Sequence, residues 1–450
     1  GDRVTVQVEK TRQALALYLA CLRAGLVYHP LNTAYTAAEL DYFIGNAEPG
    51  LIVCDRNAES TVTSLAAVGA ALPVLTLNAD GSGSLMAAAA DGDDNFVTVE
   101  RAPGDMAALL YSSGTTGRPK GIMLSHGNLL SNAQTLVQAW GFSERDRLLH
   151  ALPIFHVHGL FVAVHCALLS GCSMRWLSRF DPAAVTSALP DCTVMMGVPT
   201  YYTRLLAEGT FSRDRCADMR LFVSGSAPLL PETFHAFEQR TGHRILERYG
   251  MSETGMNSSN PLQGERRPGT VGPALPGVEL RVVDDVGTAL PIDTPGNLQV
   301  RGPNVFKGYW RMPEKTREDF TDDGFFDTGD QASISADGYV TIVGRAKDMI
   351  ICGGLNVYPK EIELFLDGLD GVRESAVVGA PHADFGEVVV AIIVGDGSRS
   401  LADDDIITPC REHLANFKVP KQVLFVKELP RNSMGKVQKN VLRKQLQSTV

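Results

Sequence analysis

Hydrophobic residues in the first half of the chain occur in short runs that are separated by segments with helical periodicity. Between residue 11 and about residue 240, the apolar runs include 51–54, 106–111 and 221–224. Short buried strands that alternate with helices are typical of parallel sheets, since each helix carries the chain back to the start of the next strand. This part of the sequence therefore predicts parallel sheets covered by helices.

The pattern changes beyond residue 265. Glycines and prolines separate strand-like runs such as 278–283 and 297–301, and an Asp337-Gly338 pair stands before the alternating run 339–343. An Asp-Gly pair between such runs indicates a hairpin turn. Residues 265–344 are therefore predicted to form a smaller β-rich subdomain.

A short charged segment at 344–348 marks a second change. Beyond it the pattern predicts a further set of elements: a helix from near 359, strands near 374–380 and 387–395, a helix near 403–415, a strand near 422–428 and a basic helix near 436–446. We place a domain boundary here, between residues 1–346 and 347–450. The predicted fold class is α/β: a large N-terminal domain with helix-covered sheets and a β-rich subdomain, followed by a small α+β C-terminal domain.

Composition and charge exclude several classes of protein. The 450 residues are 44% hydrophobic and 20% charged, as in ordinary globular proteins, and the net charge of −10 offers no broad basic surface for nucleic acid or anionic lipid. No apolar run is long enough to span a membrane, and the start lacks the order of a signal peptide. The eight cysteines occur without a C-x-x-C pair, so we expect reduced thiols and a cytoplasmic protein.

Residues 111–121, YSSGTTGRPKG, combine glycines, hydroxyl groups and a lysine directly after a predicted strand. Gly114 and Gly117 let the backbone approach an anion closely, and Lys120 adds positive charge. The hydroxyl donors are Ser112, Ser113, Thr115 and Thr116. Such a loop is suited to hold phosphates, but its spacing differs from that of the Walker A loop, which disfavours a P-loop NTPase.

The same segment resembles the signature of the adenylate-forming superfamily, which comprises acyl-CoA synthetases, peptide-synthetase adenylation domains and luciferases. Further motifs follow in the order typical of that superfamily, over nearly the whole chain. At residues 249–254, YGMSET, the resemblance implies that Tyr249 stacks on adenine, that Thr254 contacts phosphate and that Glu253 helps to hold Mg²⁺, a cation that prefers oxygen ligands. Thr116 is the second implied metal ligand.

Later motifs extend the resemblance. In residues 327–330, DTGD, the implied role of Asp330 is to accept hydrogen bonds from the ribose hydroxyls. Arg345 resembles the ribose-contacting arginine, and Lys347 matches the interdomain hinge. The nucleotide-binding residues implied in this way are Ser112, Ser113, Gly114, Thr115, Thr116, Gly117, Lys120, Tyr249, Gly250, Met251, Asp330 and Arg345.

Near the C-terminus, residues 430–439, PRNSMGKVQK, resemble the loop that carries the catalytic lysine, which here is Lys436, and Lys439 is placed on the following helix. The resemblance implies two half-reactions, with ATP and coenzyme A as co-substrates. In the first, a carboxylate attacks the α-phosphorus of ATP, with Lys436, Glu253 and Thr254 as catalytic residues. In the second, the mobile C-terminal domain has rotated, and Gly353 and Gly354 face the pantetheine of coenzyme A.

Arg248 directly precedes the adenine-stacking tyrosine. A guanidinium beside an acyl pocket would be costly for an alkyl chain, but it would pair with a second carboxylate. The segment 247–257 resembles malonyl-CoA and methylmalonyl-CoA synthetases. That resemblance implies acid-binding roles for Arg248, Ser226, His156, His158, Val157 and Met256. A structural ion pair of Arg248 and a fully hydrogen-bonded structural His158 are the alternatives.

The sequence thus predicts an AMP-forming acid–thiol ligase that makes malonyl-CoA, with methylmalonate as the expected second substrate. Three enzyme alternatives stay open: a ligase for another short or medium acid, a stand-alone adenylation enzyme that loads a carrier protein, and an oxygenase of luciferase type. A nucleotide-binding regulator is disfavoured because both Glu253 and Lys436 are retained. The expected partners are small molecules and not nucleic acid. A lysine acetyltransferase acting on Lys436 would silence the enzyme, because acetylation removes the charge.

Overall fold

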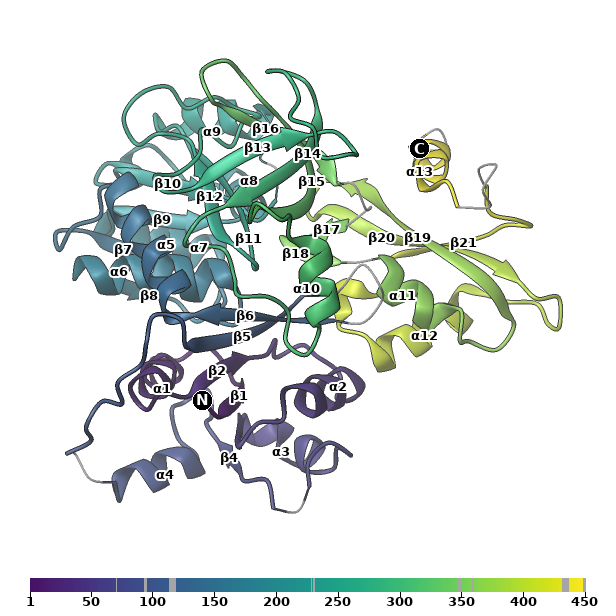
Figure 1. Ribbon diagram of the computed structural model, residues 1–450, viewed down its shortest axis with the longest axis horizontal. Coiled ribbons are helices and arrows are strands. Elements are labelled where there is room, and N and C mark those ends of the chain that lie inside the picture. Colours follow the sequence, from purple (N-terminus) through teal and green to yellow (C-terminus); the bar gives the residue numbers. More distant parts are fainter. Residues whose placement is uncertain are drawn as a thin grey trace. The chain divides into compact units, whose positions relative to one another are not determined.

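The computed structural model divides into two compact units. The N-terminal unit consists of Gly1–Thr33, Asp41–Leu110 and Gly121–Gly344, and the C-terminal unit of Ala34–Leu40, Tyr111–Lys120 and Arg345–Val450. The structure describes residues 1–69, 71–92, 95–112, 119–227, 229, 231–345, 350–357, 359–430 and 437–447. Figure 1 labels the helices and strands of both units.

The first sheet has the strand order β4-β3-β1-β2-β5-β6. Its strands are β1 (Arg3–Gln7), β2 (Val27–Pro30), β3 (Leu51–Cys54), β4 (Val74–Thr76), β5 (Met106–Ser112) and β6 (Lys120–Ser125). The helices between them are α1 (Arg12–Arg23), α2 (Ala37–Ala47), α3 (Arg56–Thr63) and α4 (Ser84–Ala90). The pairs among β1 to β5 are parallel, which confirms the prediction from the alternating pattern.

Strand β6 was not predicted from the sequence. The prediction places a helix from His126 directly after the phosphate loop. The residues 120–125 instead pair beside β5 and end at Ser125, which caps α5 (His126–Ala139). The Ser125 hydroxyl accepts the Asn128 N–H, and the Asn128 side chain accepts the Ser125 N–H, so two free amides of the first helical turn are satisfied. The helix therefore begins where the prediction places it, after one further strand.

The second sheet, with the order β12-β11-β10-β9-β7-β8, carries most of the residues discussed below. Its strands are β7 (Arg147–His150), β8 (Ser173–Trp176), β9 (Val194–Gly197), β10 (Leu221–Ser224), β11 (Leu246–Met251) and β12 (Gly255–Ser259). The surrounding helices are η1, a π-helix (His158–Val164), α6 (His165–Ser170), α7 (Pro182–Ala188), η2 (Leu189–Asp191), α8 (Pro199–Ala207), η3 (Asp214–Cys216) and α9 (Pro231–Thr241). All its pairs are parallel except β11 with β12.

A third, antiparallel sheet forms the predicted β-rich subdomain. Its strands follow one another as β13 (Glu279–Val283), β14 (Gly296–Arg301), β15 (Phe326–Ile334) and β16 (Val340–Arg345), with α10 (Pro313–Asp319) between β14 and β15. Gly338 has φ +85°, and the Tyr339 carbonyl accepts the Ser335 N–H at 3.0 Å. The Asp-Gly pair thus forms the predicted turn into the last strand.

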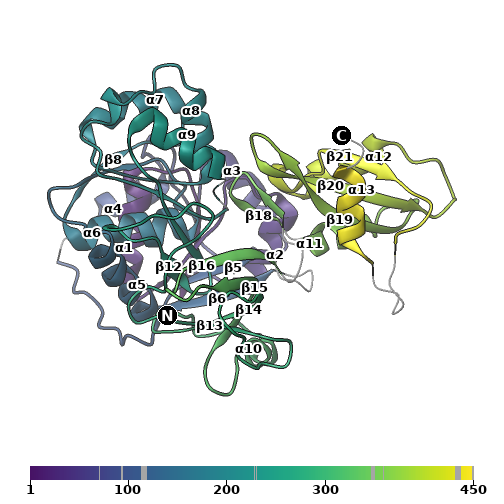
Figure 2. The same ribbon diagram turned by 90° about the horizontal axis from the view of Figure 1, so that it is seen from above.

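The C-terminal unit contains one sheet with the order β18-β17-β20-β19 and β21 beside β20. Its elements are β17 (Ile350–Cys352), β18 (Leu355–Val357), α11 (Pro359–Leu366), β19 (Val372–His382), β20 (Gly386–Gly395), α12 (Asp403–His413), η4 (Asn416–Lys418), β21 (Gln422–Phe425) and α13 (Lys439–Gln447). On β19, Val377 packs with α11 and α12, whereas its neighbour Val378 packs with Leu442 of α13. Since neighbouring strand residues point to opposite faces, helices cover both faces of this sheet, and Figure 2 shows α13 lying along it.

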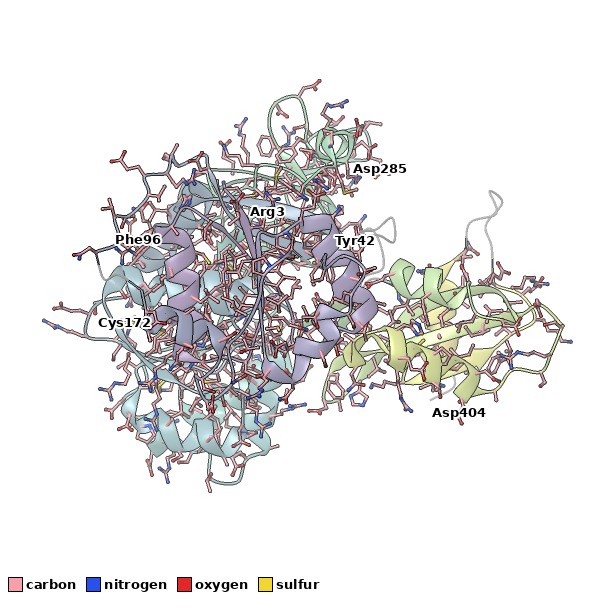
Figure 3. The ribbon with its side chains drawn as sticks, turned by 90° about the horizontal axis from the view of Figure 1, so that it is seen from below. Arg3, Tyr42, Phe96, Cys172, Asp285 and Asp404 are labelled. Atoms are coloured by element: carbon pink, nitrogen blue, oxygen red, sulfur yellow. The ribbon has the colours of Figure 1, made fainter. Side chains whose placement is uncertain are left out.

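None of the eight cysteines forms a disulfide, and all but Cys172 are buried. Burial raises the pKa of the Cys21 thiol to about 12, so that this side chain stays protonated. Figure 3 labels Cys172, which is half-buried, and Asp404, which is exposed in the acidic first turn of α12. Among the described residues, no helix has both the length and the apolar character needed to cross a membrane.

Candidate active site

Two motifs that lie far apart in the sequence meet at Tyr249 and Asp330. Tyr249 is on β11, Asp330 is a buried residue of β15, and the Tyr249 hydroxyl donates a hydrogen bond to Asp330 Oδ2 at 2.5 Å. A carboxylate has several acceptor positions, so this bond leaves room for further donors such as ribose hydroxyls. The predicted adenine-stacking and ribose-binding residues therefore belong to one place in the fold.

We expect Tyr249→Phe to raise the KM for ATP about tenfold while kcat changes little, because the ring is kept and one hydrogen bond to a charged group is lost. Steady-state pyrophosphate release at varied ATP concentration measures the change. Tyr249→Ala, which also removes the ring, should raise the KM further. An unchanged KM for ATP in Tyr249→Phe would show that the contact with Asp330 does not help nucleotide binding.

The hairpin between β11 and β12 brings several predicted residues together. Glu253 and Thr254 are buried in its turn, and the Glu253 carbonyl accepts the Phe306 N–H at 2.8 Å. Gly250 is required here, because a Cβ at this position would lie 2.1 Å from the Gly255 carbonyl oxygen. Met256 follows on β12, where Asn132 of α5 binds both its N–H and its carbonyl. The hairpin therefore holds Glu253 and Met256 in fixed places on one element.

Arg248 is the central residue among those predicted to bind the acid. Arg248 is 2% exposed, and its Nε and Nη2 atoms have no hydrogen-bond partner among the described residues. No carboxylate of the described residues forms an ion pair with it, so the alternative of a structural ion pair is wrong for that part of the chain. Burial lowers the pKa of Arg248 to about 9. A buried cation without a counter-ion is costly, and an anionic ligand would offset that cost.

Gly225 supplies the surface on which the Arg248 guanidinium packs. It follows β10, whose last residue, Ser224, pairs with Glu247 of β11. A Cβ at Gly225 would lie 2.5 Å from the Arg248 Cζ and 2.6 Å from its Nη1. Any side chain here would therefore displace the guanidinium. The neighbouring Ser226 is among the residues that the sequence implies for acid binding, but nothing local in the sequence reveals the contact of Gly225 with Arg248.

Gly225→Ala is expected to lower kcat/KM for the acid by about 10²-fold, because the methyl group overlaps the guanidinium and forces Arg248 out of place. The KM for ATP should change much less. Both values come from the acid dependence and the ATP dependence of pyrophosphate release. Gly209→Ala serves as the control, since a Cβ there meets no atom within 4 Å. Equal effects of the two substitutions would contradict the assignment.

Two histidines lie near Arg248, of which His158 is buried and His156 is half-buried. His156 Nδ1 accepts the His158 N–H at 3.3 Å, so the proton of the neutral His156 ring is on Nε2. His158 Nδ1 lies 3.3 Å from the Ser226 hydroxyl, and its buried Nε2 has no partner among the described residues. Within that part of the chain, His158 is therefore not a fully hydrogen-bonded structural histidine. Burial and the charge of Arg248 lower the pKa of His156 to about 4, and that of His158 well below its usual range. Both rings are therefore neutral near pH 7.

The loop that carries Ser226 is held under strain and anchored at both ends. Ser226 has φ +70°, a left-handed conformation that is rarely adopted by serine. At one end, the Gly225 N–H donates to the Gly197 carbonyl at 3.3 Å. At the other, Glu247 Oε1 accepts the Leu229 N–H at 2.9 Å. Burial raises the pKa of Glu247 to about 7. The role of Glu247 in holding this loop is not predicted from the sequence, because nothing in the local pattern distinguishes Glu247 from other glutamates on strands.

Gly353, Gly354 and Lys439, which the sequence analysis singles out, lie in the C-terminal unit. Gly353 and Gly354 form the two-residue turn between β17 and β18, with φ values of +58° and +78°. Such a turn requires glycine or a similar residue at both positions. Lys439 begins α13, which confirms its placement on the helix, and its Nζ lies 2.5 Å from Glu363 Oε1 on α11. This ion pair ties the start of α13 to the body of the unit.

Several predicted residues fall beyond what the structure describes. The phosphate loop residues Ser113, Gly114, Thr115, Thr116 and Gly117, the hinge Lys347 and the catalytic Lys436 lie outside the described residues. Ser112 and Arg345 are described by their backbone alone, as the last residues of β5 and β16. Lys120 begins β6 and is buried. In the part of the chain that is described, no group of three or more His, Cys, Asp or Glu side chains is arranged to hold a metal.

Comparison with known proteins agrees with the motifs. The family model of the AMP-binding enzymes matches residues 1–310, and that of the AMP-binding enzyme C-terminal domain matches residues 361–436. The chain is 35% identical to a malonate–CoA ligase of Arabidopsis thaliana, over 100% of this chain and 78% of that protein.

Solved structures are similar over most of the chain as well. ATP-bound MatB from Rhodopseudomonas palustris is 55% identical, with a TM-score of 0.77 over 99% of this chain and 88% of the other. A malonyl-CoA ligase in complex with methylmalonyl-CoA and AMP is 37% identical, with a TM-score of 0.83 over 95% of this chain and 91% of the other. The chain therefore belongs to the AMP-binding enzymes, the adenylate-forming family of acyl-CoA synthetases that its motifs resemble.

Proposed function

We propose that this enzyme is a malonate–CoA ligase, which activates malonate with ATP and transfers the malonyl group to coenzyme A. The observation that carries the proposal is the Arg248 guanidinium, which is buried without a carboxylate partner among the described residues. An acid with one carboxylate has nothing to place there, whereas the second carboxylate of malonate would neutralise it. The similar malonate–CoA ligase and malonyl-CoA ligase support the same choice.

The acid would bind through its distal carboxylate. The guanidinium of Arg248 can bind a carboxylate through two parallel hydrogen bonds, and its Nε and Nη2 atoms are both free for this purpose. The neutral His158 and the Ser226 hydroxyl stand beside it as further polar contacts. Val157 and Met256 are buried side chains that would limit the space around C2 of the acid. A methyl group at C2 is the smallest addition, so methylmalonate is the proposed second substrate.

In the first half-reaction, the reacting carboxylate forms a bond to the α-phosphorus of ATP, and the bond from that phosphorus to pyrophosphate breaks. This displacement needs no proton transfer, so the protein contributes orientation and charge stabilisation. Tyr249 and Asp330 would hold adenine and ribose, and the ammonium of Lys436 would contact the reacting carboxylate and the α-phosphate. Residues 112–120 would contact the departing phosphates.

Magnesium is the proposed cofactor. The carboxylate of Glu253 is buried in the β11–β12 hairpin, and an oxygen ligand of this kind fits a hard cation that otherwise binds phosphate oxygens and water. Thr116 is the proposed second ligand. When bound, the ion would neutralise negative charge on the phosphates of ATP.

In the second half-reaction, the thiolate of coenzyme A attacks the carbonyl carbon of malonyl-AMP, and the bond from that carbon to the AMP oxygen breaks. We propose a boundary between domains at residues 346 and 347, with Lys347 as the hinge. Rotation about a few residues would withdraw Lys436 and present the Gly353-Gly354 turn to coenzyme A. The turn needs no side chain and so allows a close approach of the thiol arm.

A panel of acids assayed for AMP formation tests the proposal. With ATP and coenzyme A present, malonate should exceed acetate and butyrate in kcat/KM by about 10²-fold or more, because two charge-assisted hydrogen bonds are gained. Methylmalonate should follow malonate, and succinate should be weaker because its distal carboxylate is one carbon farther away. An equal response to acetate would reject malonate, and AMP formation that occurs only with a carrier protein would point to the carrier-loading alternative.

We further propose a cytoplasmic location, in keeping with eight unpaired cysteines. Acetylation of Lys436 by a lysine acetyltransferase is the proposed regulation, since the modification would remove the charge needed in the first half-reaction.

A further inference from the structure

Lys10 is a second buried basic residue in the N-terminal unit, and burial lowers the pKa of its ammonium group well below the usual value. Lys10 lies between β1 and α1 and is 7% exposed. No carboxylate of the described residues forms an ion pair with its ammonium group. Its Nζ donates a hydrogen bond to the His150 carbonyl at 2.8 Å and lies 4.5 Å from the centre of the Trp176 ring. Contact with an aromatic face offsets only part of the cost of burying an ammonium group.

The hydrogen bond from Lys10 is not needed to satisfy the backbone. The His150 carbonyl also accepts the Leu177 N–H at 3.1 Å, so this buried oxygen would keep a partner without the lysine. An apolar side chain at position 10 would therefore avoid the cost of burial without leaving the carbonyl unpaired. The presence of lysine here calls for a reason other than stability.

His150 connects Lys10 to the acid side of the site. Its Nε2 donates to the Gly159 carbonyl at 2.9 Å, which places the ring proton on Nε2, and the ring stacks on Trp176 with centroids 4.7 Å apart. Burial and the charge of Lys10 lower the pKa of His150 to about 3, so the ring is neutral.

Gly159 is the last residue of the segment that contains His156 and His158. A Cβ there would lie 1.9 Å from the Pro153 carbonyl oxygen, so residues 153–159 are tightly wound. The His150 ring binds the Gly159 carbonyl at the end of this segment, directly after His158. A change in the His150 ring would therefore move the residues that face the acid.

We infer that Lys10 is a positioning residue for acid recognition: it holds His150 as a neutral donor to Gly159 and thereby fixes His156 and His158 beside Arg248. The inference rests on the proposed use of malonate. Lys10 touches neither substrate nor nucleotide in this account. Its ammonium group acts on His150 by its charge at the His150 carbonyl, and the effect reaches the site histidines through the His150–Gly159 hydrogen bond.

Lys10→Met tests the inference through the ratio of kcat/KM for malonate to kcat/KM for acetate at saturating ATP. A general loss of folded enzyme lowers both values equally and leaves this ratio unchanged. We expect the ratio to fall about tenfold, the KM for ATP to stay the same and the melting temperature to stay equal or rise. Lys315→Met, on helix α10, where Nζ pairs with Asp319 at 2.7 Å, is the control and should change neither ratio nor KM.

Two more variants locate the effect. Lys10→Gln keeps a donor for the His150 carbonyl but removes the charge, and it should also lower the ratio. His150→Gln keeps an N–H donor in the place of Nε2 and should retain the ratio, whereas His150→Leu should lower it even if Lys10→Met fails to fold.

An unchanged ratio in folded Lys10→Met, or equal ratios in His150→Leu and the unaltered enzyme, would overturn the inference. A wild-type ratio in Lys10→Gln would overturn the role of the charge. If the unaltered enzyme shows no preference for malonate over acetate, the proposed function is wrong. Failure of the proposed function is therefore seen in the unaltered enzyme, whereas failure of the inference on Lys10 is seen only in the variants.

Discussion

Replacing Arg248 with methionine is expected to lower kcat/KM for malonate by about 10³-fold while the KM for ATP stays within a few-fold of its original value. The substitution removes two charge-assisted hydrogen bonds to the distal carboxylate, each of which contributes about 1.5–3 kcal/mol. Methionine has a similar length and fills much of the same buried space. Acid-dependent and ATP-dependent pyrophosphate release, measured on the same preparation, separate the two sides of the site.

Stability should change in the opposite direction. Arg248 is buried with two nitrogens unpartnered, so an apolar replacement removes a charge that the unliganded protein does not neutralise. The melting temperature of Arg248→Met should therefore equal or exceed that of the unaltered enzyme. Addition of malonate should raise the melting temperature of the unaltered enzyme alone.

Arg248→Lys is the conservative control. It keeps a positive charge but has a single ammonium in place of the planar fork, so it should recover only part of the activity. Relative to malonate, acetate and propionate should improve in Arg248→Met, because the pocket becomes apolar. Malonate kinetics that stay unchanged in Arg248→Met would reject the role assigned to this arginine.

Replacing Lys436 with alanine should lower the rate of malonyl-AMP formation by about 10³-fold, because one charged donor is lost where negative charge develops. The second half-reaction, started from preformed malonyl-AMP and coenzyme A, should keep most of its rate, since in the proposed mechanism the C-terminal domain has by then withdrawn this lysine. Single-turnover measurement of each half-reaction gives the two rates separately.

Lys444→Ala is the matched control for this experiment. Lys444 is an exposed residue of α13, on the helix that follows the proposed catalytic loop. Its loss should change neither half-reaction. If Lys436→Ala slowed both half-reactions to the same extent, the assignment of the lysine to adenylation alone would be wrong.

The arrangement of elements follows closely from local pattern. Apolar runs at 51–54 and 221–224 are strands β3 and β10, and the alternation beyond residue 347 gives the helices and strands of the C-terminal unit. Strands β6, β17 and β18 are exceptions, and β6 consists of six residues between a loop and a capped helix that show too little periodicity to stand out. Its identity as a strand depends on pairing beside β5, which is a tertiary interaction.

The residues of the site also fall into two groups, those that the sequence predicts and those that only the folded structure shows. Tyr249, Glu253, Asp330 and Arg248 are found from motifs, because the chemistry requires those side chains at fixed places in a short segment. The residues that support them are not. Lys10 acts on a carbonyl 140 residues away, and Glu247 binds an amide 18 residues away, so no window of sequence contains both partners. Only the folded chain shows which glycine or glutamate meets a functional side chain.

Arg248 and Lys10 differ in one physical property from the surface arginines of the chain. Surface arginines such as Arg281 and Arg301 pair with acidic side chains, whereas these two are buried without a carboxylate partner among the described residues. A fold selected only for stability would favour apolar residues at both positions. In the proposed mechanism, both serve recognition of an acid that carries two negative charges.

A crystal structure of the enzyme with a non-hydrolysable malonyl-AMP analogue would show directly whether Arg248 binds the second carboxylate of the acid. We expect the distal carboxylate to lie within hydrogen-bond distance of the Arg248 guanidinium, with C2 against Val157 and Met256. A distal carboxylate bound elsewhere, with the Arg248 nitrogens still unpartnered, would contradict it.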